Sequence, residues 1–204
     1  MIEESRDPFA RIAPLYARLS YRGDSSTLLR FLQPSPDDWV LDVGGGTGRV
    51  ARGLTAATRG VVVVDPSAEM LRRGKPEPGI VRACAQAEAL PFADGAFSRI
   101  VVVDAFHHFA SRPAATRELW RVLAPGGLLV IEEPDIRHRA VRAIAFGEWL
   151  LRFGSVFWDP PRIATAFTYL GAKASVLPNE GYVSHVVIQK IQEDPKGPLI
   201  AKNP

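Results

Sequence analysis

The sequence predicts a doubly wound α/β fold, with a mostly parallel sheet of seven strands and helices on both of its faces. Short apolar segments alternate with helical ones along the chain, an order that is typical of parallel sheets. The apolar segments are hydrophobic at nearly every position, as in Val61–Val64, which indicates strands buried on both faces. The last two strands are separated by Pro178–Gly181, a hairpin-like turn. That turn predicts an antiparallel C-terminal strand.

Seven segments have the composition of strands, and five more have that of helices. The expected strands are Trp39–Val43, Val61–Val64, Ile80–Cys84, Phe97–Val103, Leu128–Glu132, Ala174–Leu177 and Val183–Lys190. The expected helices are Thr27–Leu32, Val50–Thr58, Ser67–Arg73, Pro113–Leu123 and Pro161–Leu170. Ser67 is suited to cap its helix, and Gly171 lies where the C-terminal cap of the last helix belongs.

The length and composition favour a single domain. The chain has 204 residues, of which 47% are hydrophobic, enough to form a core in one domain. We place that domain at residues 1–190 and a polar tail at 191–204. The net charge of +3 is too small for the strong positive field that is typical of nucleic-acid binding. Nucleic acid is therefore not an expected partner.

The sequence also predicts a compartment. Cys84 is the single cysteine and is expected to be a small core residue, so that no disulfide framework forms within the chain. The first nine residues include three acidic side chains and lack the apolar core of a signal peptide. No apolar segment reaches the roughly 18 residues that cross a bilayer. We expect a cytoplasmic protein with no stable membrane insertion.

A glycine-rich turn links the first strand to the helix that follows it. The turn reads Asp42-Val-Gly-Gly-Gly-Thr-Gly48, and glycine lets the backbone bend sharply and a ligand approach closely. Asp65 ends the second strand, about 20 residues downstream of the turn, where an acidic side chain suits the two hydroxyls of a ribose. Turn, helix, strand and acid in this order predict an adenosine-type cofactor. The alternative is a turn of purely structural use.

Two cofactors suit this arrangement, a nicotinamide dinucleotide and S-adenosylmethionine. The dinucleotide fingerprint requires glycine at the third and sixth positions counted from Gly44. Gly46 meets the first requirement, but Arg49 occupies the sixth position, where the helix must approach a pyrophosphate closely. S-adenosylmethionine has no phosphate, and its methionine part needs exposed backbone and an acid such as Asp42. S-adenosylmethionine is the expected cofactor, and a nicotinamide-dependent oxidoreductase or a catalytically silent cofactor-binding protein is the alternative.

Five motifs in order resemble those of class I S-adenosylmethionine-dependent methyltransferases. They are Val40–Gly48 for the glycine motif, Val63–Leu71 for the ribose segment, Ala87–Ser98 for the loop before the fourth strand, and Asp104–Phe109 and Arg121–Gly127 for the two later motifs. The third is similar to that of the ubiquinone and menaquinone biosynthesis group, called methyltransferase type 11. Phe9–Tyr16 resembles the N-terminal helix of that group. The resemblance implies a Rossmann-like methyltransferase fold.

The resemblance also implies which residues surround S-adenosylmethionine. Gln86 departs from the family, which usually has Asp there, and an amide oxygen accepts a hydrogen bond from the adenine less strongly. The implied set is Tyr16 to close the site, Asp42 and Asp104 beside the methionine, Gly44, Gly46 and Gly48 in the turn, Asp65 at the ribose, Pro66 and Met70 flanking the ring, and Gln86 and Ala87 at the adenine.

Methyl transfer from a sulfonium is an in-line displacement on an activated donor. The protein therefore mainly positions donor and acceptor, without a metal, and a base is needed only where the acceptor loses a proton. His107 and His108 follow the fourth strand, at the edge where open sheets bind ligands, and are the candidate catalytic bases. In the alternative, one packs and the other binds backbone. Glu132, Glu133 and Asp135 are expected to be solvated or to cap.

The segment Ala140–Trp158 is expected to be helical and is apolar nearly all round. It either packs over the sheet or forms the face of a homodimer, or it lines an apolar acceptor pocket as a lid. In the lid interpretation, residues 136–170 cover the acceptor site, while helices in residues 1–33 close the cofactor site. The sequence thus predicts methyl transfer to a small-molecule acceptor, apolar or aromatic.

Overall fold

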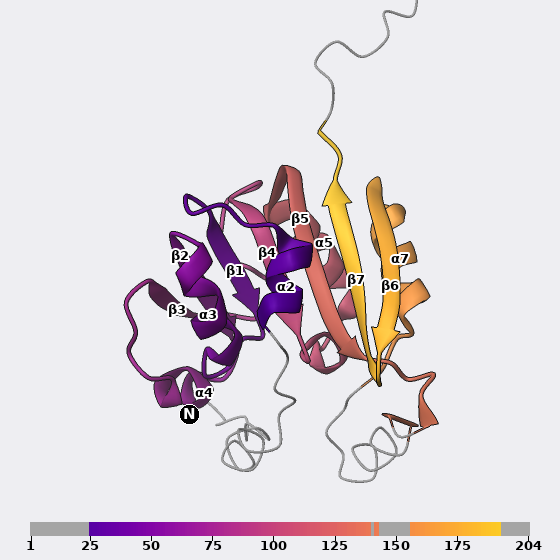
Figure 1. The fold of residues 1–204 in the computed structure, drawn as a ribbon, viewed down its shortest axis with the longest axis horizontal. Helices are drawn as coiled ribbons and strands as arrows, with labels where there is room; N and C mark the ends of the chain where they lie inside the picture. Colours follow the sequence, from indigo (N-terminus) through magenta and orange to yellow (C-terminus); the bar gives the residue numbers. More distant parts are fainter. Residues whose placement is uncertain (1–24, 140, 143–155, 193–204) are drawn as a thin grey trace, which may run out of the picture.

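The seven strands form one sheet in the order β3-β2-β1-β4-β5-β7-β6 (Figure 1). The computed structural model describes residues 25–139, 141–142 and 156–192, so the predicted helix at Phe9–Tyr16 lies outside the described residues. The strands are β1 (Trp39–Val43), β2 (Gly60–Asp65), β3 (Ile80–Cys84), β4 (Phe97–Val103), β5 (Leu123–Pro134), β6 (Ala172–Glu180) and β7 (Val183–Lys190). The first five are mutually parallel, and β7 runs antiparallel to both β5 and β6.

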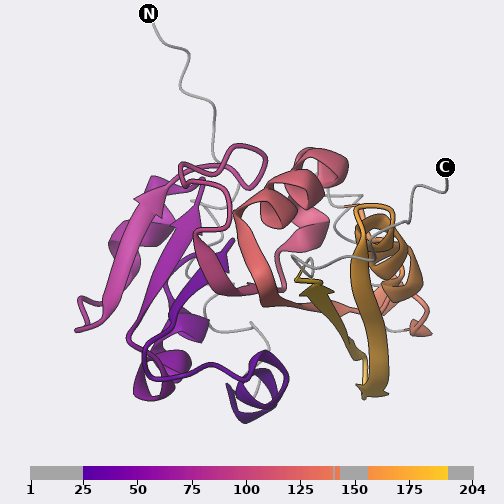
Figure 2. The same ribbon diagram turned by 90° about the horizontal axis from the view of Figure 1, so that it is seen from above.

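Helices cover both faces of the sheet, as Figures 1 and 2 show. The bounds are α2 (Ser25–Leu32), α3 (Arg49–Leu54), α4 (Ala68–Arg73), α5 (Arg112–Val122) and α7 (Pro160–Thr168), with single 3₁₀ turns at Thr55–Ala57 (η1) and Phe106–His108 (η2). Helices α2 and α3 lie on one face, and α5 and α7 lie on the other. The predicted doubly wound fold is therefore confirmed.

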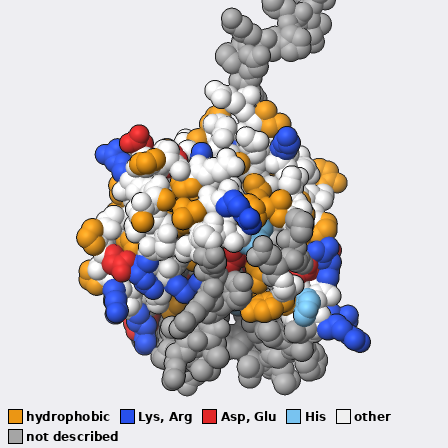
Figure 3. All heavy atoms as spheres, viewed as in Figure 1, with side chains coloured by type: hydrophobic (Ala, Val, Ile, Leu, Met, Phe, Trp, Pro, Cys, Tyr) orange, Lys and Arg blue, Asp and Glu red, His pale blue; other side chains and the backbone are white. Residues whose placement is uncertain are grey.

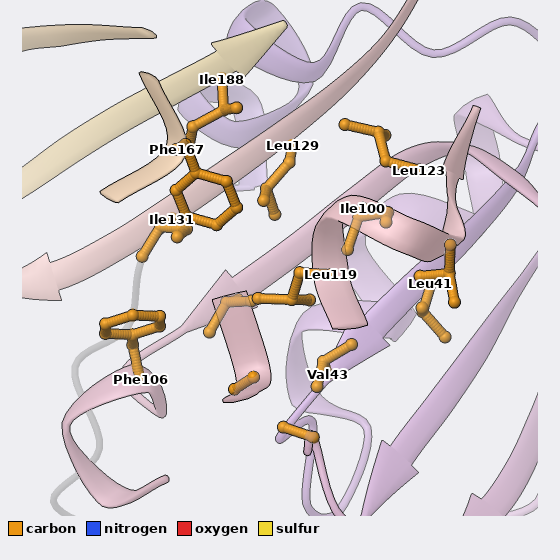
Figure 4. Packing of buried hydrophobic residues seen from close by; sticks show 14 of the residues in the cluster. Leu41, Val43, Ile100, Phe106, Leu119, Leu123, Leu129, Ile131, Phe167 and Ile188 are labelled. Atoms are coloured by element: carbon orange, nitrogen blue, oxygen red, sulfur yellow. The ribbon is translucent and has the colours of Figure 1, made fainter. Parts of the chain in front are cut away.

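The two hydrophobic cores explain why the strands are apolar throughout. Successive side chains of a strand point to opposite faces. In β1, Val40 belongs to the core that contains Leu28 of α2, while Leu41 belongs to the core that contains Leu119 of α5 and Phe167 of α7 (Figure 4). All five side chains are at most 2% exposed, and burial of each contributes roughly 1.5–3 kcal/mol. Both faces of the sheet thus need hydrophobic residues.

The helix ends follow the local capping residues. The Ser67 hydroxyl accepts a hydrogen bond of 3.2 Å from the backbone N–H of Met70, as the N-cap of α4. Gly171 has a φ of +89° and follows the C-terminal end of α7, in the left-handed conformation expected of a terminating glycine. Gly181, with a φ of +73°, makes the turn between β6 and β7. The predicted caps and hairpin are confirmed, but β6 continues to Glu180, so the turn lies at residues 181–182 rather than at Pro178–Gly181.

Strand β5 is longer than predicted, and this changes the interpretation of three acidic residues. The strand continues to Pro134, so Glu132 and Glu133 lie within it rather than in a loop. Glu132 and Glu133 are each 4% exposed, and Asp135 is buried directly after the strand. The expectation of solvated acids was wrong, because β7 pairs with β5 over Leu128–Pro134 and keeps this end of the strand inside the sheet. The capping alternative fits Asp135, whose Oδ1 accepts a hydrogen bond of 2.9 Å from the backbone N–H of Arg137.

Two further expectations need comment. Cys84 is exposed rather than part of the core, because β3 is an edge strand and Cys84 lies at its end. Most of the predicted helix Ala140–Trp158 lies outside the described residues, and Val156–Trp158 is irregular rather than helical. The lid and homodimer interpretations of this segment stay predictions. Among the residues that the structure describes, no helix is long and apolar enough to cross a membrane.

Candidate active site

The glycine turn lies at the carboxyl edge of the sheet, between β1 and α3. Gly44, Gly46 and Gly48 have φ values of +76°, +53° and +79°, a region that disfavours residues with a side chain. The backbone N–H groups of Gly44 and Gly45 donate to the carbonyl oxygen of Val64, at 2.7 and 3.2 Å. The turn is therefore fastened to β2, and its glycines are required by the backbone itself.

Gly44 also contacts the segment that follows β4. A Cβ atom at Gly44 would lie 2.5 Å from the Cβ of Ala105 and 3.6 Å from the ring of Phe109. Ala105 comes directly after Asp104, which has a φ of +53° and donates its backbone N–H to the carbonyl oxygen of Glu132. The glycine turn and the β4 loop thus touch, because position 44 has no side chain.

Asp65 faces the turn from the end of β2. Its Oδ2 accepts a hydrogen bond of 3.0 Å from the backbone N–H of Gly46, and its Oδ1 accepts one of 2.8 Å from that of Ser67. These two bonds orient the Asp65 carboxylate toward the turn. The predicted ribose acid is therefore held against the glycine turn, and its contact with a ribose stays a prediction.

Asp42 lies on the other side of the turn, beneath Gly45. Its side chain is 1% exposed, and its Oδ2 is buried and has no hydrogen-bond partner within the described part of the chain. A Cβ atom at Gly45 would lie 2.5 Å from this oxygen. The pKa of Asp42 is raised to about 7, mainly by burial and in part by the nearby Asp65 carboxylate, while Arg49 opposes the shift. A cationic group nearby would favour the ionised form.

The residues expected at the adenine differ in exposure. Met70 is buried, and its Cε would lie 3.0 Å from a Cβ atom at Gly46, so it lines the turn. Pro66 and Gln86 are exposed. Ala87 is buried within the core that α5 covers. Since the Ala87 side chain faces the core, only its backbone is available to a ligand.

Arg121 of α5 clamps the loop that follows Gln86 and Ala87. Its guanidinium donates to the carbonyl oxygens of Leu90 and Phe92, at 3.0 and 2.7 Å. It also pairs with Glu118, whose Oε2 accepts from the backbone N–H of Leu90 at 2.8 Å. Its hydrogen bonds with the carboxylates of Glu118 and Asp94 raise the pKa of Arg121 above its already high value. Arg121 therefore fixes the far end of a loop whose first residues, Gln86 and Ala87, are the expected adenine contacts.

Glu133 organises the segment after β4. Its Oε1 accepts hydrogen bonds from the backbone N–H groups of Ala105 and Phe106, at 2.9 and 2.7 Å. Its Oε2 lies 2.6 Å from Nδ1 of His107. His107 is 2% exposed, and its ring stacks on Phe157 with centroids 4.3 Å apart and an interplanar angle of 14°. One carboxylate therefore holds both the backbone and the imidazole of this turn.

His108 has a different environment from His107. Burial and the neighbouring His107 lower the pKa of His108 to about 2. The two rings lie with their centroids 3.9 Å apart. An imidazole that protonates only at such low pH is a poor proton acceptor near neutrality. Of the two candidate bases, His107 is the better placed.

A second histidine–glutamate pair lies on the opposite face of the same strand. His185 of β7 is directly across from Glu132 in the antiparallel register, and its Nε2 lies 2.9 Å from Oε2 of Glu132. Both are buried, and Phe31 of α2 meets the His185 ring edge-on at 5.2 Å between centroids. Because Glu132 and Glu133 are adjacent in a strand, their side chains point to opposite faces.

The structure brings together several of the residues that the sequence predicts for the site. Gly44, Gly46, Asp65 and Met70 form one cluster, which Ala105 joins after Asp104. Tyr16 lies outside the described residues. Glu133 and Arg121 are the functional candidates that sequence reasoning missed. For Glu133 a signal existed, because it continues the two-residue alternation of the buried Leu129 and Ile131.

The fold and the site together define a class of protein. A parallel sheet with a glycine turn after β1 and an anchored acid after β2 binds an adenosine cofactor at its carboxyl edge. The dinucleotide-binding sheet has the order 3-2-1-4-5-6, whereas here the antiparallel β7 lies between β5 and β6. The sheet therefore does not support the nicotinamide alternative.

Part of the chain is similar in sequence to known proteins. Residues 41–131 match the methyltransferase domain family. The chain is 37% identical over 122 residues to a mitochondrial 2-methoxy-6-polyprenyl-1,4-benzoquinol methylase of Leishmania donovani, covering 49% of this chain and 42% of that protein. It is 29% identical over 163 residues to a demethylmenaquinone methyltransferase of Mycobacterium tuberculosis, covering 76% and 67%. The match thus spans less than half of the first relative and about two thirds of the second.

Solved structures share the fold. A chain in the complex between the Haloferax volcanii Trm112 methyltransferase activator and the putative methyltransferase has a TM-score of 0.73 and 16% identity, covering 90% of this chain and 96% of that chain. A Thermotoga maritima protein described as a possible histamine N-methyltransferase has a TM-score of 0.71 and 20% identity, covering 89% and 98%. Residues 41–131 thus match a methyltransferase domain, and the fold is shared with the Thermotoga maritima protein, which is described as dependent on S-adenosylmethionine.

The described residues fit this cofactor. The buried, unpartnered Oδ2 of Asp42 suits an ammonium group nearby, and Asp65 suits a pair of hydroxyls. The left-handed glycines leave a backbone surface that a side chain would fill, since Met70 already approaches Gly46 closely. The charge of a sulfonium compound also agrees with two carboxylates around the turn.

Proposed function

We propose that this protein transfers the methyl group of S-adenosylmethionine to a small-molecule acceptor. The observation that carries the proposal is the position of Asp65, whose two oxygens are held by Gly46 and Ser67 at the end of β2. This arrangement presents an oriented carboxylate next to a turn with no side chains. The cofactor supplies an activated methyl group, so the protein needs mainly to orient the two reactants.

We assign the remaining cofactor contacts by position. Asp42 favours the methionine ammonium, Met70 packs on the ring, and the backbone at Ala87 meets the adenine with the exposed Gln86. Asp104 lies beside the methionine part, where the left-handed backbone turns out of β4. Tyr16 stays a prediction for closure of the site.

We infer that the acceptor is apolar or aromatic. Four aromatic side chains lie next to the turn after β4: Phe106, Phe109, Phe157 and Trp158. The ring of Phe106 meets those of Phe109 and Trp158 edge-on, at 5.5 and 5.8 Å between centroids. Aromatic and aliphatic side chains are typical of pockets for small molecules. Relatives named for benzoquinol and demethylmenaquinone agree with a flat acceptor.

Calorimetric titration with S-adenosylmethionine tests the cofactor site. Asp65→Ala is expected to weaken binding by about 1–3 kcal/mol, the cost of leaving polar partners unsatisfied. Asp37→Ala is a matched control, because Asp37 is an exposed acid in the loop before β1, at the opposite edge of the sheet. The control should bind as the wild type does. Equal affinity of Asp65→Ala and wild type, with both proteins folded, would contradict the assignment.

A further inference from the structure

We propose that Glu133 is a positioning residue for S-adenosylmethionine, because its carboxylate holds residues 104–106 against the glycine turn of the cofactor site. This role rests on the proposed function and deepens it, since it adds to the cofactor site a residue from β5. Glu133 acts through the backbone of the segment after β4, and His107 need not touch the methyl acceptor for this role.

The segment after β4 depends on a hydrogen-bond acceptor from elsewhere in the chain. Asp104 has a φ of +53°, a left-handed conformation that is unfavourable for most residues other than glycine. The next two backbone N–H groups, those of Ala105 and Phe106, both donate to Oε1 of Glu133, at 2.9 and 2.7 Å. Successive N–H groups that converge in this way form a concavity for an anion. Here the anion is a side chain of the protein, and its removal would leave two buried donors without their acceptor.

The Glu133 carboxylate is itself held in one orientation. Its side chain is 4% exposed, and its Oε2 lies 2.6 Å from Nδ1 of His107. The His107 ring is in turn enclosed, because it stacks on Phe157 at 4.3 Å and lies 3.9 Å from the ring of His108, measured between centroids. His107 therefore supports Glu133, whose Oε1 stays directed at the backbone of the segment after β4.

The segment that Glu133 holds is in contact with the glycine turn. A Cβ atom at Gly44 would lie 2.5 Å from the Cβ of Ala105 and 3.6 Å from the ring of Phe109. Ala105 thus closes the β4 side of the turn, while the hydrogen bond from Gly44 to the carbonyl oxygen of Val64 fastens the turn to β2. The turn is held from two sides, and one of them depends on Glu133.

This arrangement links a residue outside the cofactor site to cofactor affinity. A ligand binds more weakly when only a fraction of the molecules has its site in place, in proportion to that fraction. Without the Oε1 acceptor, residues 104–106 lose the bonds that hold them beside Gly44. Fewer molecules then have a complete site, and the measured affinity for S-adenosylmethionine falls.

Glu132, the adjacent residue of β5, provides a matched control. It is equally buried and also pairs with a histidine, since its Oε2 lies 2.9 Å from Nε2 of His185. The two carboxylates point to opposite faces, because neighbouring residues of a strand alternate, and His185 meets the ring of Phe31 in α2. If both carboxylates serve only the fold, their removal affects cofactor binding equally, whereas a positioning role predicts an effect for Glu133 alone.

The test compares Glu133→Met, Glu133→Gln and Glu132→Met in the full chain by calorimetric titration with S-adenosylmethionine, where circular dichroism shows each variant to be folded. Glu133→Met removes the acceptor and should weaken binding by about tenfold or more. Glu133→Gln keeps an acceptor oxygen, and its amide can donate to Nδ1 of a neutral imidazole. Both Glu133→Gln and Glu132→Met should lose less than about fivefold, the lower end of typical couplings between sites.

Three results of this titration would overturn the role of Glu133. The first is wild-type affinity in Glu133→Met. The second is an equal loss in Glu133→Met and Glu132→Met, which indicates a general effect on the fold. The third is an equal loss in Glu133→Met and Glu133→Gln, which indicates that the charge of Glu133 matters rather than its hydrogen bonds to the backbone.

Amide hydrogen exchange in the wild type gives a second readout, which applies even if Glu133→Met does not fold. A segment whose position favours cofactor binding is stabilised to the same extent by bound cofactor, because coupling is reciprocal. We expect saturating S-adenosylmethionine to slow exchange at Ala105 and Phe106 by about fivefold or more, relative to the amides of β7 as a reference for global opening. Slower exchange at Gly46 without this change at Ala105 and Phe106 would overturn the role.

Two further outcomes separate the role of Glu133 from the cofactor site itself. If the wild type does not bind S-adenosylmethionine, the proposed cofactor site is wrong, and the role of Glu133 is overturned with it. If Asp65→Ala weakens binding as expected while Glu133→Met binds as tightly as the wild type, the cofactor site stands and only the role of Glu133 is overturned.

Discussion

The cofactor half of the carboxyl edge, at β1 and β2, is built differently from the half at β4 and β5. In the first half, backbone atoms and the carboxylates of Asp42 and Asp65 surround the glycine turn, and all of them come from residues 42–65. In the second, the side chain of Glu133 holds a turn that is 26 to 28 residues away in the sequence. The halves meet where Ala105 packs on Gly44.

The difference shows how the same edge supports two tasks. A cofactor common to a whole class is bound by backbone geometry, which few substitutions preserve. An acceptor that differs between proteins is bound by side chains and loops, which change without altering the sheet.

In Figure 3, basic and acidic side chains are interspersed over the face that α2 and α3 cover, in agreement with the small net charge of +3.

The largest expected effect is on the half that depends on one side chain. Glu133→Ala leaves the N–H groups of Ala105 and Phe106 and the Nδ1 of His107 without their buried acceptor. We expect the free energy of unfolding to fall by about 3–5 kcal/mol, as measured by chemical denaturation. Glu133→Gln keeps an acceptor oxygen and should lose less. If Glu133→Ala lowers the free energy of unfolding by less than about 1 kcal/mol, the second half does not depend on this one side chain.

The contact between the halves is tested at Gly44. Gly44→Ala combines left-handed strain with a Cβ atom 2.5 Å from that of Ala105. Gly181→Ala has nearly the same φ and nothing within 4 Å, so it measures the strain alone. We expect Gly44→Ala to be less stable than Gly181→Ala by about 1–3 kcal/mol and to bind S-adenosylmethionine more weakly. Equal losses would indicate that the halves move apart freely.

Asp42 predicts opposite effects on stability and binding. Its pKa rises from 3.8 in the unfolded chain to about 7 in the folded protein, so between these values the folded protein retains a proton that the unfolded chain has lost. The free energy of unfolding therefore falls as pH rises through this window, and the loss is complete above it. Asp42→Asn should be more stable than wild type above pH 7, by at least about 1.4 kcal/mol.

Denaturation curves at both ends of that window check this prediction. The gain of Asp42→Asn should shrink toward the acidic end, where both proteins are neutral at this position. Binding of S-adenosylmethionine should be weaker in Asp42→Asn, because the ammonium loses its carboxylate. If Asp42→Asn gains stability and binds S-adenosylmethionine as tightly as wild type does, Asp42 does not contribute to cofactor binding.

The smallest effect is expected at the Arg121 clamp. Arg121→Lys keeps the charge but cannot reach Leu90, Phe92 and Glu118 together, since lysine lacks the fork of donors. Because the salt bridges are partly exposed, each contributes little. We expect about two- to fivefold weaker S-adenosylmethionine binding, seen by calorimetry, with kcat unchanged. A larger effect on kcat than on affinity would link the clamp to the acceptor half instead.

Most of the fold could be predicted from the sequence, because its signals are local. The apolar segment Val61–Val64, the cap at Ser67 and the glycine at 171 each encode a structure within a few residues. The length of β5 could not be predicted in this way. Glu132 and Glu133 are typical of exposed positions, and only pairing with β7 makes them part of a buried strand.

The sequence by itself predicted the cofactor half, because the glycine turn and Asp65 lie on consecutive elements. Glycine residues mark the positions where the backbone must bend, and the acid follows them at a typical spacing. Only the tertiary structure decided that Glu133 joins His107, that Glu132 joins His185, and that burial lowers the pKa of His108. Such pairs depend on which strands become neighbours in the sheet and on how far water is excluded. Neither the pairing of strands nor the exclusion of water is set by nearby residues in the sequence, because contacts between distant residues form only when the whole sheet has assembled.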